Sequence, residues 1–123
     1  MSWEMSRSAV HQWRGFLEVL TRQRVGEPVT VRFISVERGS RLVADRDPLS
    51  HISYFDRDDV VVVCVARVGA DHIGREHIIQ HPWKIIFDAP SPGAVGRIDI
   101  EGADGARTLV TLHSRGGRSL AGA

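Results

Sequence analysis

Residues 10–33 read VHQWRGFLEVLTRQRVGEPVTVRF, and the spacing of their apolar residues changes partway along. In the first part the apolar residues recur every three or four positions, which predicts a helix with one apolar face. That face consists of Val10, Trp13, Phe16, Leu17 and Leu20. Ser6 or Ser8 is the expected N-cap, and Gly26 is the expected stop of a helix that ends near Arg24.

Beyond Pro28 apolar and polar residues alternate, which is the pattern of a strand with one buried face. More segments of this kind follow, separated by turn sequences such as ERGSR, PSPG and GADG. Residues 59–68, DVVVVCVARV, are apolar on both faces and are the expected central strand. Residues 46–53, RDPLSHIS, are expected to be a loop or an edge, because Pro48 cannot donate a backbone hydrogen bond. The expected strands are residues 29–33, 41–45, 59–68, 72–79, 83–89, 96–102 and 107–113.

Only one segment is long enough for a substantial helix, so a parallel sheet is excluded and the strands are expected to pair antiparallel. The expected fold class is α+β, with an N-terminal helix packed on a curved antiparallel sheet of about six or seven strands that can curl into a half-barrel. Trp13 and Trp83 are expected core anchors. We assign residues 8–113 to this single domain, residues 1–7 to a flexible arm and residues 114–123 to a disordered tail.

The composition of the 123-residue chain is typical of a globular protein, with 42% hydrophobic and 25% charged residues. The formal net charge is +1, without the basic excess that usually marks a dedicated nucleic-acid binder. The single cysteine, Cys64, excludes an intrachain disulfide, and its apolar neighbours predict a small buried hydrophobe. No signal peptide or membrane-spanning run is apparent, so a cytoplasmic protein without a membrane partner is expected.

The stretch HIGREHIIQHP, residues 72–82, holds three histidines and is the part of the chain that most resembles a chemical site. His77 and His81 are four positions apart, as zinc ligands on a helix often are. A glycine, two β-branched isoleucines and Pro82 disfavour a helix in this stretch, however. We therefore expect the histidines to lie on a strand.

On a strand, His77, Ile79 and His81 share one face, while His72 and Ile78 point the other way. Two such histidines lie about 6.5–7 Å apart along the strand, which is long for two ligands of one metal ion. A third ligand would have to come from elsewhere, and the candidates are His51, Glu76 and Asp71. The alternatives to a metal site are a solvated or hydrogen-bonded strand edge, acid–base chemistry and pH sensing.

Residues 45–53, DRDPLSHIS, place Asp45, Arg46, Asp47 and His51 in an irregular stretch, where functional residues often concentrate. The acids of DRDD and GADG are expected turn residues, because Asp forms local hydrogen bonds in turns. The chain has no nucleophile elbow, phosphate-binding glycine loop or dinucleotide fingerprint. No catalytic residue is therefore assigned.

Five segments occur together and in this order in a known group of small proteins: WRGFLEVLTRQ, PVTVRFIS, DRDPLSHIS, DHIGREHIIQHPWKIIF and GRIDIEGADGARTLVTL. On these segments, which span about residues 8–112, the chain resembles the uncharacterised domain of unknown function 5335 family of bacteria and archaea. The resemblance implies no activity, cofactor or catalytic residue. It implies that the family features include Pro48, Leu49, Ile52, His77, Ile79 and Pro82, with His72 in a recurring Asp-His pair.

The leading functional hypothesis is a small non-enzymatic domain that acts through protein–protein contact and self-associates as a homodimer or other homo-oligomer, because a small sheet has exposed edges. Its candidate interaction residues are Asp45, Asp47, Pro48, Leu49, His77 and Pro82. One alternative is a domain that binds a metal or small ligand, with candidate ligands His51, His72, His77 and His81. A second alternative is a weak nucleic-acid binder, and an enzyme ranks last. No cofactor is expected.

Overall fold

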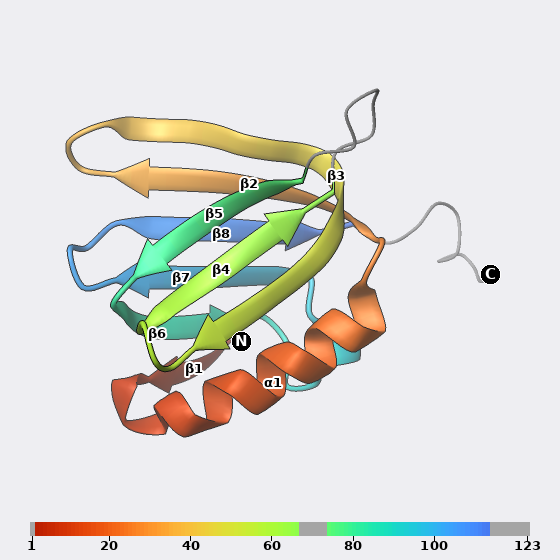
Figure 1. Cartoon of the computed structure of the whole chain (residues 1–123), viewed down its shortest axis with the longest axis horizontal. Coiled ribbons are helices and arrows are strands. Elements are labelled where there is room, and N and C mark those ends of the chain that lie inside the picture. Colours follow the sequence, from red (N-terminus) through yellow and green to blue (C-terminus); the bar gives the residue numbers. More distant parts are fainter. Residues whose placement is uncertain (1, 67–73, 114–123) are drawn as a thin grey trace.

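The computed structural model describes residues 2–66 and 74–113, which form one α-helix and eight strands (Figure 1). The helix α1 spans Val10–Arg24, and two short 3-10 helices, η1 and η2, span Arg7–Ala9 and Pro92–Ala94. The strands are β1 Trp3–Ser6, β2 Pro28–Ser35, β3 Gly39–Phe55, β4 Val60–Val65, β5 Arg75–Gln80, β6 Pro82–Phe87, β7 Arg97–Gly102 and β8 Arg107–Leu112. None of the described helices has the length and apolarity needed to cross a membrane.

The strands form one antiparallel sheet in the order β1-β6-β7-β8-β2-β3-β4-β5. β3 belongs to two layers, because its first part pairs with β2 and the part from Leu49 onward pairs with β4. The front layer consists of Leu49–Phe55 of β3 with β4 and β5, and the back layer of the remaining strands; Figure 1 shows the front layer crossing the back one. The expected helix on a curled antiparallel half-barrel is confirmed, with eight strands in place of six or seven.

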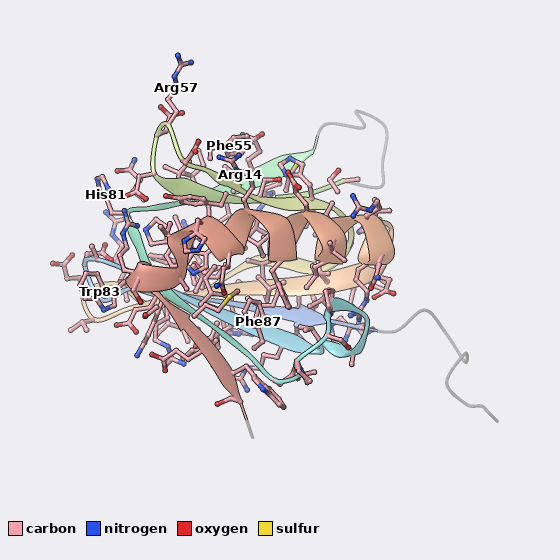
Figure 2. The ribbon with its side chains drawn as sticks, turned by 90° about the horizontal axis from the view of Figure 1, so that it is seen from below. Arg14, Phe55, Arg57, His81, Trp83 and Phe87 are labelled. Atoms are coloured by element: carbon pink, nitrogen blue, oxygen red, sulfur yellow. The ribbon has the colours of Figure 1, made fainter. Side chains whose placement is uncertain are left out.

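The core lies between the two layers, and α1 closes one side of it (Figure 1). Trp13, Leu17 and Leu20 are fully buried, as the spacing in the sequence predicts. Phe16 packs against Phe87 of β6 with ring centroids 4.2 Å apart, and Figure 2 looks onto this side of the molecule. Burying each such side chain contributes about 1.5–3 kcal/mol, so the apolar face of α1 is what holds the helix on the sheet.

The N-terminal residues are part of the sheet, which corrects the prediction of a flexible arm at residues 1–7. β1 pairs with the edge of β6, where Trp3 lies opposite Phe87. Arg7, directly after β1, forms an ion pair with Asp59. The short sequence of β1 has no clear strand pattern, so its position depends on partners that are far away along the chain.

Residues 46–53 continue β3 instead of forming a loop, and from Leu49 onward β4 is the only strand that β3 pairs with among the described residues, which agrees with the alternative of an edge. Pro48 lies opposite Pro28, near the end of the β2–β3 ladder, where its missing N–H can be tolerated. Its carbonyl accepts a hydrogen bond of 2.8 Å from the Ala66 N–H. Arg46 has a φ of +59°, and the pairing with β4 shifts just after Leu49. Such irregularities bend a strand, and here they carry β3 from the back layer into the front layer.

Trp83 is 55% exposed, so the prediction of a core anchor at this position is wrong. The register between β6 and β7 shifts between Pro82 and Lys84, and this irregularity breaks the simple inward–outward alternation of β6. Figure 2 shows Trp83 at the same end of the molecule as His81. The expected disordered tail, residues 114–123, lies outside the described residues.

Candidate functional site

The described histidines among the predicted metal ligands lie in separate surroundings. His77 is hydrogen-bonded to Thr108 and His81 to Asp59, whereas His51 is hydrogen-bonded to Ser53. The fourth candidate, residue 72, lies outside the described residues. These contacts do not bring His51, His77 and His81 together at one site.

His81 forms the corner at which the chain leaves β5 and enters β6. Its φ is +50°, and that of Asp59, which is close in space, is +55°. This left-handed conformation is uncommon outside glycine, although Asp and His adopt it more often than most residues. The His81 N–H donates to the Asp59 carbonyl at 2.9 Å, which fixes the corner. The expected common face with His77 and Ile79 is therefore wrong for His81, because the strand ends before it.

The Asp59 carboxylate lies at the centre of a group of polar side chains from distant parts of the chain. Arg7 donates to its two oxygens at 2.8 and 2.9 Å and to the Pro82 carbonyl at 2.7 Å. The Tyr54 hydroxyl donates to Asp59 at 2.8 Å, and His81 Nδ1 lies 3.1 Å from the other oxygen. We call Arg7, Tyr54, Asp59 and His81 the corner cluster. It ties η1 to the β3–β4 turn, which contains Asp59, and to the β5–β6 corner, which contains His81.

The charges of the corner cluster stabilise one another. Hydrogen bonds from Arg7, supported by His81 and Tyr54, hold the pKa of Asp59 at about 2, below its ordinary 3.8, although burial acts in the opposite direction. The same contact raises the pKa of Arg7, and burial together with the bond to Asp59 raises the pKa of Tyr54. Asp59 therefore stays ionised near neutral pH and is poorly suited to donate a proton. The contacts of the cluster are those of a structural site that holds η1, the β3–β4 turn and the β5–β6 corner together.

His77 points into the half-barrel. Its Nε2 lies 3.0 Å from the hydroxyl oxygen of the fully buried Thr108, and its ring meets Phe33 edge-on at 5.3 Å between centroids. Burial lowers the pKa of His77 below its ordinary value, and the positive charge of Arg41 adds to the effect. A neutral histidine that bridges β5 to β8 and β2 joins the two layers, so a role in packing accounts for its contacts.

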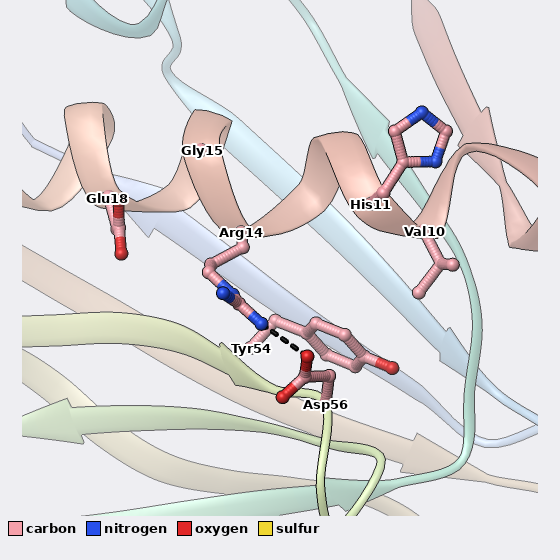
Figure 3. A pocket seen from close by; sticks show the side chains of 7 residues that line it. All are labelled: Val10, His11, Arg14, Gly15, Glu18, Tyr54 and Asp56. Atoms are coloured by element: carbon pink, nitrogen blue, oxygen red, sulfur yellow. Dashed lines mark hydrogen bonds and ion pairs between the residues drawn. The ribbon is translucent and has the colours of Figure 1, made fainter.

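A groove of about 350 Å³ lies between α1 and the end of β3 (Figure 3). An ion pair between Arg14 and Asp56 crosses it, while the His11 ring points away from the strand side in Figure 3. Both partners of this ion pair are more than half exposed, so it contributes little to stability. His11, Glu18 and Tyr54 line the same groove.

The outer face of the front layer is apolar in its middle. Two rows of residues cross the three strands there: Phe55, Val60 and Gln80 form one, and Ser53, Val62 and Ile78 form the next. Phe55 is 46% and Ile78 52% exposed. The sequence of β4 predicts a central strand covered on both faces. In the sheet, β4 lies next to the edge strand β5 and is the middle strand of the front layer only. Val62 on β4, which lies between the strands of Phe55 and Ile78, is only 7% exposed.

His51, Cys64 and Glu76 form the next row on this outer face, one residue on each strand. Cys64 lies opposite His51 on one side and opposite Glu76 on the other. One nitrogen of His51, the Cys64 Sγ and one carboxylate oxygen of Glu76 all lie within 4.8 Å of one another. Cys64 is half-buried and next to two polar side chains, which differs from the expected small buried hydrophobe.

The remaining predicted residues have structural positions. Leu49 is 1% exposed and Pro82 is also buried, so neither presents its side chain to a partner. Asp45 accepts a hydrogen bond of 3.2 Å from the Thr30 hydroxyl. Asp47 lies opposite Val29 in the β2–β3 ladder. Asp45 and Asp47 therefore belong to the β2–β3 ladder and not to a loop-borne site.

Sequence reasoning missed the corner cluster and the position of Cys64. Asp59 does lie in the turn that the DRDD sequence predicts. Its partners, however, come from η1, β3 and the β5–β6 corner. Cys64 and Glu76 became neighbours through strand register, and no spacing within one segment reports that register. A histidine, a cysteine and a glutamate on three separate strands leave no linear motif.

A family model described as a family of unknown function, DUF5335, matches residues 4–118. The match begins within β1 and extends past β8, so it includes every strand of the described sheet. Neither the curated proteins nor the solved structures contain a match to the chain. A functional inference must therefore come from the described side chains and strand edges.

Proposed function

The chain belongs to the DUF5335 family, and we propose that it is a small interaction domain that self-associates through the free edge of β5. The proposal rests on one observation: β5 ends the strand order and has an exposed apolar residue, Ile78, at its middle. An unpaired strand edge presents backbone donors and acceptors that a second strand can satisfy.

The two edges of the front layer differ in a way that supports this proposal. At the β3 edge, the Thr21 hydroxyl of α1 bonds to both the N–H and the carbonyl of Ile52, each at 3.0 Å. The backbone groups of Ile52 on that edge are therefore satisfied by α1. At the other edge, β5 has no strand neighbour beyond it among the described residues. A second copy of the chain is the partner that would satisfy the β5 edge symmetrically.

The alternation of antiparallel hydrogen bonds identifies which groups of β5 face outward. His81 bonds to Asp59 through its backbone N–H, and Ile79 lies opposite Val61 in the same register. The alternate residues therefore direct their N–H and carbonyl groups away from β4. These residues are Glu76, Ile78 and Gln80.

Antiparallel pairing of two β5 strands about Ile78 matches their side chains. Ile78 then lies opposite Ile78 of the second copy, and Glu76 lies opposite Gln80, so no two carboxylates face each other. Cross-strand apolar pairs contribute about 0.2–1 kcal/mol each, and an amide can donate to the facing carboxylate. The outer faces of the two front layers would become one continuous surface that includes the exposed Phe55 and Ile78 of both copies.

The substitution Ile78→Lys tests the proposal, because it would place two ammonium groups directly across the two-fold axis. We expect the dimer dissociation constant to rise at least about tenfold, which corresponds to 1.4 kcal/mol. Val36→Lys is the matched control, because Val36 is an exposed apolar residue in the β2–β3 turn. Sedimentation velocity over a wide concentration range measures both variants against the unmodified chain.

A strictly monomeric chain at every concentration would end the proposal, and so would equal weakening of the dimer by Ile78→Lys and Val36→Lys.

Cytoplasmic location is part of the same proposal, supported by a single cysteine that can form no intrachain disulfide. Weak nucleic-acid binding is less well supported, because Arg7, Arg14 and Arg107 are all paired with aspartates. A gel shift at low salt, where phosphate contacts are strongest, tests that alternative.

A further inference from the structure

The row formed by His51, Cys64 and Glu76 combines the three kinds of donor that zinc accepts in proteins. Imidazole nitrogen, thiolate sulfur and carboxylate oxygen are all ligands of this ion, and a mixed set of this kind suits a borderline metal better than calcium or magnesium. The three side chains project from neighbouring strands of the front layer in direct register. Rigid strands hold ligand positions more closely than loops do.

We propose that His51, Cys64 and Glu76 form a binding site for a zinc-class divalent cation on the outer face of the front layer. The protein supplies three ligands, and the fourth position of a tetrahedral site is left to solvent or to a small anion. Binding requires the thiolate form of Cys64, so a proton leaves the thiol as the metal enters, and the affinity falls at acidic pH. The site does not depend on the proposed self-association.

The geometry is close to that of a bound ion. Zinc–nitrogen and zinc–oxygen distances near 2.1 Å and a zinc–sulfur distance near 2.3 Å place the ligand atoms of a tetrahedral site about 3.3–3.7 Å apart. The three donor atoms lie within 4.8 Å of one another before any metal is present. A contraction of about 1 Å, within reach of small side-chain rotations, completes the arrangement.

The surroundings support the assignment. His51 Nδ1 lies 2.9 Å from the Ser53 hydroxyl oxygen, and a hydrogen bond of this kind commonly orients a histidine that binds metal through its other nitrogen. Gly74 passes beside the site, where an added Cβ would lie only 2.9 Å from the Val65 carbonyl and 3.7 Å from the Cys64 sulfur. The absence of a side chain there keeps the space next to the thiol free.

Cobalt is the most direct probe, because Co²⁺ replaces zinc and its thiolate complexes absorb strongly in the near ultraviolet. The untagged chain is titrated with Co²⁺ under reducing conditions and then with Zn²⁺ in competition. Since Cys64 is the only cysteine in the chain, any sulfur-to-cobalt band reports on this site alone. We expect one equivalent of metal per chain and displacement of the band by zinc.

Variants distinguish a site made of three protein ligands from a thiol that binds metal alone. Cys64→Ser should abolish the band, His51→Ala and Glu76→Gln should each weaken cobalt binding more than tenfold, and Ser53→Ala should weaken it by about tenfold. His11→Ala is the control, because His11 is an exposed histidine on α1. Glu76 is also exposed, so Glu76→Gln reports on the site even if Cys64→Ser impairs folding. The absence of a band at one equivalent, or binding that His51→Ala and Glu76→Gln leave unchanged, would overturn the proposal.

Discussion

The corner cluster offers a sharp test of how the N-terminal residues are held, through the substitution Asp59→Asn. Asparagine keeps the shape of the side chain and tolerates the left-handed backbone that Asp59 adopts at φ +55°. It removes the negative charge that Arg7, Tyr54 and His81 surround. The change in stability therefore reports on the charge and not on backbone strain.

The magnitude follows from the pKa of Asp59, which the cluster holds at about 2 against an ordinary 3.8. That difference corresponds to about 2.5 kcal/mol of stability at neutral pH. The Asp59 side chain is 22% exposed and that of Arg7 is 40% exposed, so solvent screening reduces the contribution. We expect Asp59→Asn to lower the free energy of unfolding by about 1–2 kcal/mol, and Tm by roughly 4–8 °C.

The pH dependence of the free energy of unfolding provides a second test of the same substitution. A carboxylate whose pKa is lowered by folding stabilises the protein above its ordinary pKa, and this contribution is lost as the pH falls through the folded value. The difference between the unmodified chain and Asp59→Asn should therefore be constant above about pH 5 and shrink from about pH 4 towards pH 2.

Urea denaturation at several pH values measures these differences. Asp56→Asn is the control, because Asp56 belongs to the same turn and forms an exposed ion pair with Arg14. We expect that control to change stability by less than about 0.5 kcal/mol. An equally small effect of Asp59→Asn, or an effect that does not shrink in acid, would refute the reasoning about the corner cluster.

Two further predictions concern the interior. Burial lowers the pKa of His77 from its ordinary 6.5, so the native state resists protonation and the free energy of unfolding should fall as the pH drops below 6.5. In urea denaturation, His77→Gln should lessen this pH dependence. An unchanged dependence of the free energy of unfolding on pH between 7.5 and 5.5 would contradict the prediction. Leu17→Ala should cost about 2–5 kcal/mol, because Leu17 lies on the buried face of α1, whereas Leu42→Ala should cost less than about 1 kcal/mol at its exposed position. Similar losses for the two leucine variants, measured by the same denaturation, would mean that α1 does not pack as described.

The sequence predicts elements whose signal is local and misses those that depend on distant partners. The stripe from Val10 to Leu20 predicts α1 because a helix needs only its own periodicity, and the turns at DRDD and GADG follow from local chemistry. β1 was missed because its short segment is ordered by β6. The continuation of β3 through Pro48 was missed because this proline lies at a point where the strand changes partners.

The same contrast between local signals and distant partners applies to the candidate sites. The strand pattern correctly places His77 and Ile78 on opposite faces of β5, and Ile78 is the residue on which the proposed self-association depends. The pattern fails at His81, where a left-handed corner ends the alternation. The grouping of His51 with Cys64 and Glu76 depends on the register of three strands, which arises from the packing of the whole sheet.

The most direct test of the proposed interface is hydrogen exchange at the backbone amides of β5, measured at low and high protein concentration. The amides of Glu76, Ile78 and Gln80 face away from β4, and no strand of the described residues lies beyond them, so pairing with a second β5 would protect them. We predict that their exchange slows as the concentration rises in the unmodified chain and stays fast in Ile78→Lys. Exchange at these three amides that is equally fast at every concentration would contradict self-association through β5.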